Sequence, residues 1–126
     1  MLKFALEKLV AQAKANNIHR MAEMQVQSDY VLKVLEALGW KSSDWALGSN
    51  IGANTGTFSD ILLHDSKKHP VLVVECKDAK KADKLDGCYR NQPFQEQLYG
   101  YCRKQGLYWS ILTNFIEGRL YNETQG

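Results

Sequence analysis

Apolar residues recur along this chain with two periods, one typical of helices and one typical of strands. In residues 2–15 they return every three or four positions, and residues 20–38 repeat this spacing, so both segments are predicted as amphipathic helices. Gly39 follows the second segment and is expected to end it with a positive φ, so that Trp40 folds back onto the last turn. Beyond residue 44 the apolar runs shorten and are bounded by turn residues, which is the pattern of strands.

The short apolar runs predict strands at residues 45–47, 58–63, 71–77, 108–113 and 119–121. A glycine-rich stretch at 48–56 and a polar stretch at 64–70 are predicted as turns between the first three of these strands. Residues 45–77 are therefore expected to form a three-stranded antiparallel meander.

A third helix is predicted after the meander. Pro93 suits its first position, the helix should end near Gly106, and the polar residues 78–91 before it are expected to form a loop. Because this helix joins strand 71–77 to strand 108–113, a right-handed crossover should make the two strands parallel.

The predicted order of elements is α-α-β-β-β-α-β-β, an α/β fold with a central mixed β-sheet of about five strands flanked by helices. The chain has 126 residues and shows no repeat, linker or low-complexity tract. We therefore expect residues 1–126 to form a single domain.

The composition indicates the cellular environment of the protein more clearly than its activity. The net charge is +2, which does not identify a nucleic-acid binder and does not exclude one, because a local basic patch is sufficient. Cys76, Cys88 and Cys102 form no CxxC pair, which argues against a disulfide framework or structural zinc and favours a reduced, cytoplasmic setting. No apolar run approaches the ~20 residues that cross a bilayer, and the N-terminus lacks a secretion-signal pattern, so no membrane partner is expected.

The most informative residues are Asp60, Glu75 and Lys77, which interrupt or end apolar strand runs. Side chains two apart in a strand share a face, so Glu75 and Lys77 should point together while Cys76 points the other way. If the strands containing Asp60 and Glu75 are neighbours, two carboxylates and an ammonium group converge. Carboxylates with a backbone carbonyl are ligands that suit Mg²⁺, and the carbonyl of Cys76 is the expected third ligand. A bound Mg²⁺ with Lys77 beside it suits phosphodiester hydrolysis.

Each of these residues also has an ordinary interpretation. A lone aspartate in a strand is usually a turn or edge residue, and Glu75 with Lys77 could be a solvent-facing pair on an amphipathic strand. The spacing of the three residues is itself degenerate. Their position favours the site, because a charge at the end of a central apolar strand is costly unless it is used.

Several short segments, taken in order, resemble the PD-(D/E)xK nuclease superfamily, and within it the N-terminal nuclease domain of type I restriction enzyme R subunits and related type IV-like endonucleases. The segments are EALGW (36–40), SD (59–60), VLVVECK (71–77), QLYGY (97–101), WSILTN (109–114) and GRLY (118–121). The resemblance covers about residues 20–122. One departure is Ser59, which stands where the superfamily motif has proline.

The resemblance implies a restriction-endonuclease-like core and assigns further residues. Glu23 falls where the family carries a glutamate that reaches the metal site or orients a ligand, and its alternative role is a solvated helix face. Gln97 and Tyr101 lie one helical turn apart and correspond to a QxxxY element that supports the metal site or the DNA backbone. For Tyr101 the alternative is plain core packing.

The loop after the third predicted strand is rich in cations. Lys80, Lys81, Lys84 and Arg90 follow Lys77 within fourteen residues, interspersed with aspartates. They are candidate contacts to DNA phosphates, and a solvated loop is the alternative.

The sequence therefore predicts a metal-dependent endodeoxyribonuclease, restriction-like or recombination-like, that uses Mg²⁺ with Mn²⁺ as a substitute and has DNA as its partner. The alternative is a catalytically silent module on the same fold that binds nucleic acid or another subunit. A homodimer is one expected setting on geometric grounds, because cutting both strands of a duplex needs two sites or two visits. The family's R subunits carry a motor after this domain, so a larger restriction-type assembly is the other expected setting.

Overall fold

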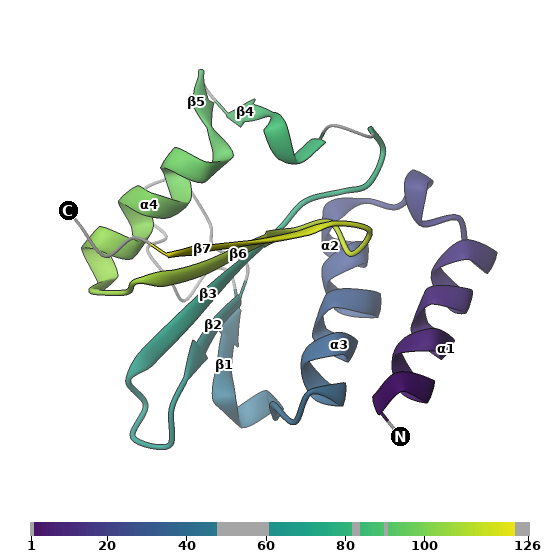
Figure 1. Cartoon of the computed structure of the whole chain (residues 1–126), viewed down its shortest axis with the longest axis horizontal. Helices are drawn as coiled ribbons and strands as arrows, with labels where there is room; N and C mark the ends of the chain where they lie inside the picture. Colours follow the sequence, from purple (N-terminus) through teal and green to yellow (C-terminus); the bar gives the residue numbers. More distant parts are fainter. Residues whose placement is uncertain (1, 48–60, 82–83, 90, 123–126) are drawn as a thin grey trace.

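A computed structural model describes residues 2–47, 61–81, 84–89 and 91–122 (Figure 1). Its centre is a five-stranded sheet in the order β1-β2-β3-β6-β7. The strands are β1 (Trp45–Leu47), β2 (Ile61–His64), β3 (Pro70–Cys76), β6 (Trp109–Thr113) and β7 (Gly118–Asn122). Neighbouring strands are antiparallel except β3 and β6, which are parallel. The predicted antiparallel meander and the predicted parallel pairing of the two strands joined through the third helix are therefore confirmed.

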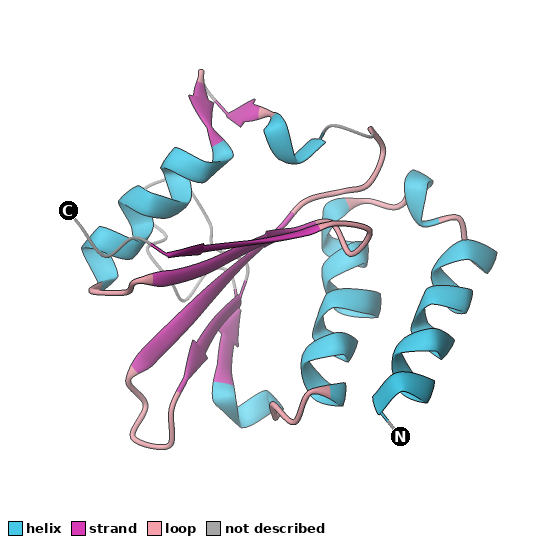
Figure 2. Cartoon of the chain, in the orientation of Figure 1, coloured by secondary structure: helices cyan, strands magenta, loops and turns pink. Residues whose placement is uncertain are grey.

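Helices cover both faces of the sheet (Figure 2). On one side lie α1 (Leu2–Ala15) and a second helix built from α2 (Glu23–Val26), a π-helical turn η2 (Gln27–Val31) and α3 (Leu32–Ala37). A short 3₁₀ turn, η1 (Ile18–Arg20), connects these helices, and another, η3 (Ser42–Asp44), leads into β1. On the other side lies α4 (Phe94–Gln105). No helix in the part of the chain that is described is both long and apolar enough to cross a bilayer.

The second helix ends as its sequence predicts. Gly39 has a φ of 106°, and its N–H donates to the carbonyl of Glu36 at 3.0 Å. The N–H of Trp40 donates to the carbonyl of Leu35, also at 3.0 Å. This pair of bonds satisfies carbonyls that a helix end leaves without intrahelical donors, and it turns the chain toward β1.

Alternation along β3 sends its side chains into two separate cores. Val74 and Cys76 pack with residues of α1 to α3, such as Val26 and Tyr30. Val73 packs instead with residues of α4 and β6, which include Leu98, Cys102 and Leu112. Glu75 and Lys77 follow Val73 in the two-residue period and so belong to the α4 side of the sheet.

The segment between β3 and α4 differs from the expected loop. It contains a 3₁₀ turn, η6 (Lys84–Asp86), and a small ladder between β4 (Cys88–Tyr89) and β5 (Gln92–Pro93). The prediction of Pro93 at the first helical position is wrong. With φ −57° and ψ 145° this proline is the extended N-cap residue, and α4 begins at Phe94. The physical reason is the pairing of Pro93 with Cys88, which holds its backbone extended in the ladder. The predicted turn at 48–56 and the first half of the predicted strand 58–63 lie outside the described residues.

Candidate active site

The candidate site is built at the carboxyl end of β3, the middle strand of the sheet. Glu75 is the second-last residue of β3 and lies beside Leu112 of the parallel strand β6. Lys77 follows the strand, and its backbone N–H donates to the carbonyl of Thr113 at 2.8 Å, which extends the pairing. Cys76 between them is fully buried on the opposite face. The predicted common face of Glu75 and Lys77 is therefore confirmed.

Glu75 and Lys77 form an ion pair, with Nζ of Lys77 3.1 Å from Oε2 of Glu75. Only 12% of the lysine side chain and 14% of the glutamate side chain are exposed. The ammonium also lies over the ring of Phe94, 4.1 Å from its centroid. A solvent-facing pair on an amphipathic strand would be far more exposed, so this alternative does not fit the structure.

Glu23 reaches the same region from the other helical layer. It is the first residue of α2, and its side chain is half-buried. Burial raises the pKa of Glu23, whereas the positive charge of Lys77 lowers it, Asp78 raises it and Lys84 lowers it. Glu23 is therefore within electrostatic range of the residues that follow β3, and it is not a fully solvated helix-face residue.

A contact between distant segments brings Glu23 into range. Nδ1 of His19, in η1, lies 2.9 Å from the carbonyl oxygen of Ala79, just beyond the end of β3. Because α2 begins three residues after η1, this contact sets the first turn of α2 beside the end of the strand. No spacing in the sequence links residue 19 to residue 79, so sequence reasoning assigns this histidine no role.

A second ion pair extends the charged group. Nζ of Lys84 lies 3.6 Å from Oδ2 of Asp78, and both side chains are more than half buried. Among the predicted DNA-contacting residues, Lys80 and Lys81 are exposed and Lys84 is engaged with Asp78. Arg90 lies outside the described residues.

The expected metal ligands are described only in part. Asp60 lies outside the described residues, and the pairing of β2 with β3 is described as far as Ile61 and Val74. The carbonyl of Cys76 faces the β2 side of β3, because the N–H of Lys77 faces β6 and successive backbone groups alternate between the two edges. Within the residues that the structure describes, no group of three or more His, Cys, Asp or Glu side chains could hold a metal ion.

Gln97 and Tyr101 both lie on α4 but have different surroundings. Nε2 of the half-buried Gln97 donates to the carbonyl of Gln92 at 3.3 Å, which links the helix to β5. Tyr101 is buried among Phe94, Leu98 and Cys102 in the core on this side of the sheet. The burial of Tyr101 therefore fits the alternative of core packing. A role for Gln97 or Tyr101 at the site stays a prediction.

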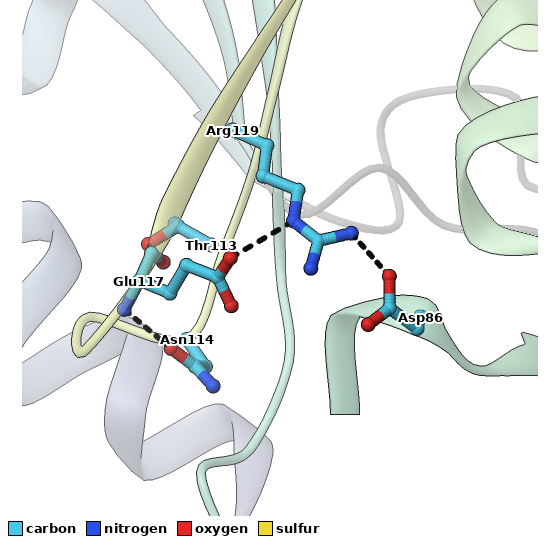
Figure 3. A network of polar contacts seen from close by, with 5 residues as sticks. All are labelled: Asp86, Thr113, Asn114, Glu117 and Arg119. Carbon is cyan, nitrogen blue, oxygen red and sulfur yellow. Dashed lines mark hydrogen bonds and ion pairs between the residues drawn. The ribbon is translucent and has the colours of Figure 1, made fainter. Parts of the chain in front are cut away.

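A polar network fixes the segment before α4 to the sheet (Figure 3). Nη1 of Arg119, on β7, lies 2.7 Å from Oδ1 of Asp86, and its Nε lies 3.0 Å from Oε2 of Glu117. These bonds lower the pKa of Asp86 and raise that of Arg119. Glu117 belongs to a turn in which its N–H donates to Oδ1 of Asn114 at 2.8 Å. The network joins η6 to the β6–β7 turn, so it holds the segment that carries Lys84 in place.

Fold and site together define an α/β domain with a buried acid–lysine pair at the carboxyl end of a central strand. Comparisons of the chain with protein-family models, with curated proteins and with solved structures found no match.

Proposed function

We propose that this chain is a metal-dependent endodeoxyribonuclease of the PD-(D/E)xK type, built on a restriction-endonuclease-like core. The observation that carries the proposal is the Glu75–Lys77 pair, which is largely buried at the end of β3 with its ammonium and carboxylate 3.1 Å apart. A buried pair of this kind contributes little net stability, because desolvation offsets the Coulomb attraction. A functional reason for keeping it is therefore favoured over a structural one.

The donor atoms at the site suit a hard divalent cation. The carboxylate of Glu75 and the carbonyl of Cys76 both belong to the last two residues of β3, and Asp60 is bonded directly to Ile61, the partner of Val74. We propose that Asp60, Glu75 and the carbonyl of Cys76 hold Mg²⁺, for which Mn²⁺ can substitute. When bound, the cation supplies charge neutralisation at the phosphate and a more acidic water molecule.

The remaining side chains hold and orient the reacting groups. Lys77 is kept in place by Glu75 and donates to the attacking water or to a developing negative charge on the phosphate. Glu23 is partly desolvated, and such a carboxylate gains more from a nearby cation than an exposed one. It therefore suits the orientation of a ligand beside the site, and Gln97 and Tyr101 are proposed to assist from α4.

Positively charged side chains beside the site suit contacts with the phosphates of the DNA backbone. Lys80 and Lys81 are exposed directly after the segment that carries Lys77, where they can contact phosphates on either side of the scissile bond. Lys84 and Arg90 are the further candidates. A homodimer, or a larger restriction-type assembly, would supply the second cut of a duplex.

The test is cleavage of supercoiled plasmid DNA with Mg²⁺ or Mn²⁺ by the wild type and by Lys77→Ala. The control is Lys67→Ala, an exposed lysine in the β2–β3 turn at the opposite end of β3. The proposal predicts a loss of about 10²–10³-fold or more in rate for Lys77→Ala, the scale of removing a transition-state donor. It predicts no change for Lys67→Ala. Equal rates for Lys77→Ala and the wild type would refute the assignment.

A catalytically silent module on the same fold is the second candidate. The observation in its favour is that the charges of Glu75 and Lys77 neutralise each other at 3.1 Å, so the pair is satisfied in the absence of a cation. Calorimetric titration with Mn²⁺ separates the two functions. A nuclease site should bind Mn²⁺ and lose that binding in Asp60→Ala, whereas a silent module would ignore the ion and still retard DNA in a gel.

A further inference from the structure

The ammonium group of Lys77 is held from two directions. Oε2 of Glu75 lies 3.1 Å from Nζ, and the centroid of the Phe94 ring lies 4.1 Å from the same atom. Phe94 is buried, with 6% of its surface exposed. We propose that Phe94 is a positioning residue, which fixes the location of the Lys77 ammonium group. The contact stands on geometry alone, and only its effect on cleavage rests on the proposed nuclease function.

The physical basis is the negative face of an aromatic ring. A cation within about 6 Å of the centroid is attracted to that face, and the attraction strengthens when water is excluded. Here both the ring and the lysine are largely removed from water. Lysine is a long side chain with much rotational freedom, so two directional contacts on one ammonium group restrict where it can be.

The ring is itself held in place by the segment before α4. The backbone N–H of Phe94 donates to the carbonyl of Gly87 at 3.2 Å. A Cβ atom on Gly87 would stand 3.2 Å from Cε2 of the ring and 3.0 Å from the carbonyl oxygen of Lys84. An alanine here would require the ring or this carbonyl group to move by a few tenths of an ångström. The chain of contacts therefore runs from Gly87 through Phe94 to Lys77 and Glu75.

Core packing is the ordinary role of a buried phenylalanine, and Phe94 does belong to the core with Leu85 and Leu98. A role in packing alone would leave the mobility of the Lys77 ammonium group unchanged when the ring is replaced by another apolar side chain. A positioning role makes the order of this group depend on the ring, because the contact between the ammonium and the ring face at 4.1 Å is then lost.

The first experiment uses NMR at a fixed pH to measure the order parameter of the ε-methylene group of Lys77, with its signal assigned by its disappearance in Lys77→Arg. Phe94→Leu keeps an apolar side chain but removes the ring, and we expect the order parameter of this group to fall. The control is Leu107→Val, an equally buried core residue just beyond the other end of α4, and it should leave the order parameter unchanged. An unchanged order parameter in Phe94→Leu would overturn the proposal.

Gly87→Ala is the second variant, because it displaces the ring without changing its chemistry. It should lower the order parameter of Lys77 as well, and it keeps the proposal testable if Phe94→Leu does not fold. Folding of each variant is checked by circular dichroism. An order parameter equal to that of the wild type in a folded Gly87→Ala would count against the chain of contacts.

The second experiment measures plasmid cleavage in a double-mutant cycle. Phe94→Leu should lower kcat about tenfold with KM for DNA nearly unchanged, and it should cause no further decrease in a Lys77→Ala background. An equal decrease in both backgrounds would show that Phe94 does not act through Lys77. If the wild type cleaves nothing while the order parameter of Lys77 still falls in Phe94→Leu, the nuclease function fails and the positioning of Lys77 stands.

Discussion

Replacing Glu75 by glutamine removes the negative charge next to Lys77 and keeps the size of the side chain. In the folded protein the carboxylate lies 3.1 Å from Nζ of Lys77, and the lysine side chain is 12% exposed. Glu75→Gln therefore leaves a largely buried cation without the carboxylate that neutralises it.

The size of the effect follows from this geometry. Removing one partner of a fully buried ion pair costs about 3–5 kcal/mol, because the other charge stays in a poorly solvated position. Residual exposure reduces the penalty here, and so does the ring of Phe94, whose attraction for a desolvated ammonium amounts to about 1–2 kcal/mol. We expect Glu75→Gln to lower the free energy of unfolding by about 2–3 kcal/mol at pH 7.

Two further variants test whether the loss of stability comes from the buried charge that remains on Lys77. Glu75→Gln combined with Lys77→Met leaves no charge on either side chain, so most of the stability should return. The control is Glu36→Gln on α3, whose partner Lys33 lies 3.6 Å away with 55% of its side chain exposed. That change should cost less than about 0.5 kcal/mol, as is usual for exposed pairs on a helix.

The assay is equilibrium unfolding in urea, monitored by tryptophan fluorescence. The slope of the unfolding free energy against urea concentration is compared among the variants. The result that would refute the reasoning is a destabilisation in Glu75→Gln no larger than in Glu36→Gln. A double variant that is less stable than Glu75→Gln alone would also contradict it, because the penalty would then not arise from the uncompensated cation.

Three other results are expected. Burial raises the pKa of Glu23, so the folded state holds the proton of this carboxyl group more tightly than the unfolded state does. The stability that the protonated group contributes is therefore lost as the pH rises through the raised pKa. Glu23→Gln should stabilise the protein at pH 7 and have little effect at pH 4, measured by urea unfolding at each pH. Gly39→Ala should cost about 1 kcal/mol or more at its φ of 106°, and an unchanged midpoint in urea would argue against the helix end described. The double variant Lys80→Ala, Lys81→Ala should weaken DNA binding equally across DNA sequences. The slope of the logarithm of the binding constant against the logarithm of salt concentration should fall by about 1 for each phosphate that the variant no longer neutralises. An unchanged slope would show that neither lysine lies in the DNA interface.

The sequence is most informative where a local pattern determines the structure. Apolar spacing locates the helices at 2–15 and 20–38, and Gly39 marks the end of the second because positive φ favours glycine. The crossover between β3 and β6 follows from a helix lying between two strands. Alternation along β3 is enough to place Glu75 and Lys77 on one face.

Features that depend on distant contacts are not visible in the sequence. The β4–β5 ladder consists of two-residue strands, which carry no readable alternation, and it changes the role expected of Pro93. In the sequence Phe94 is one more apolar residue of a helical stripe, because nothing local places its ring over Lys77. Glu23 lies near the site through the contact of His19 with Ala79, which joins residues 60 positions apart.

The central claim is tested most directly by diffraction from a crystal soaked in Mn²⁺, with the ion located by its anomalous signal. The proposed site predicts one ion at the carboxyl end of β3, ligated by Asp60, the carboxylate of Glu75 and the carbonyl of Cys76, with Lys77 beside it. Crystals in which Glu75 still closes on Lys77 and no manganese lies near either residue would contradict it.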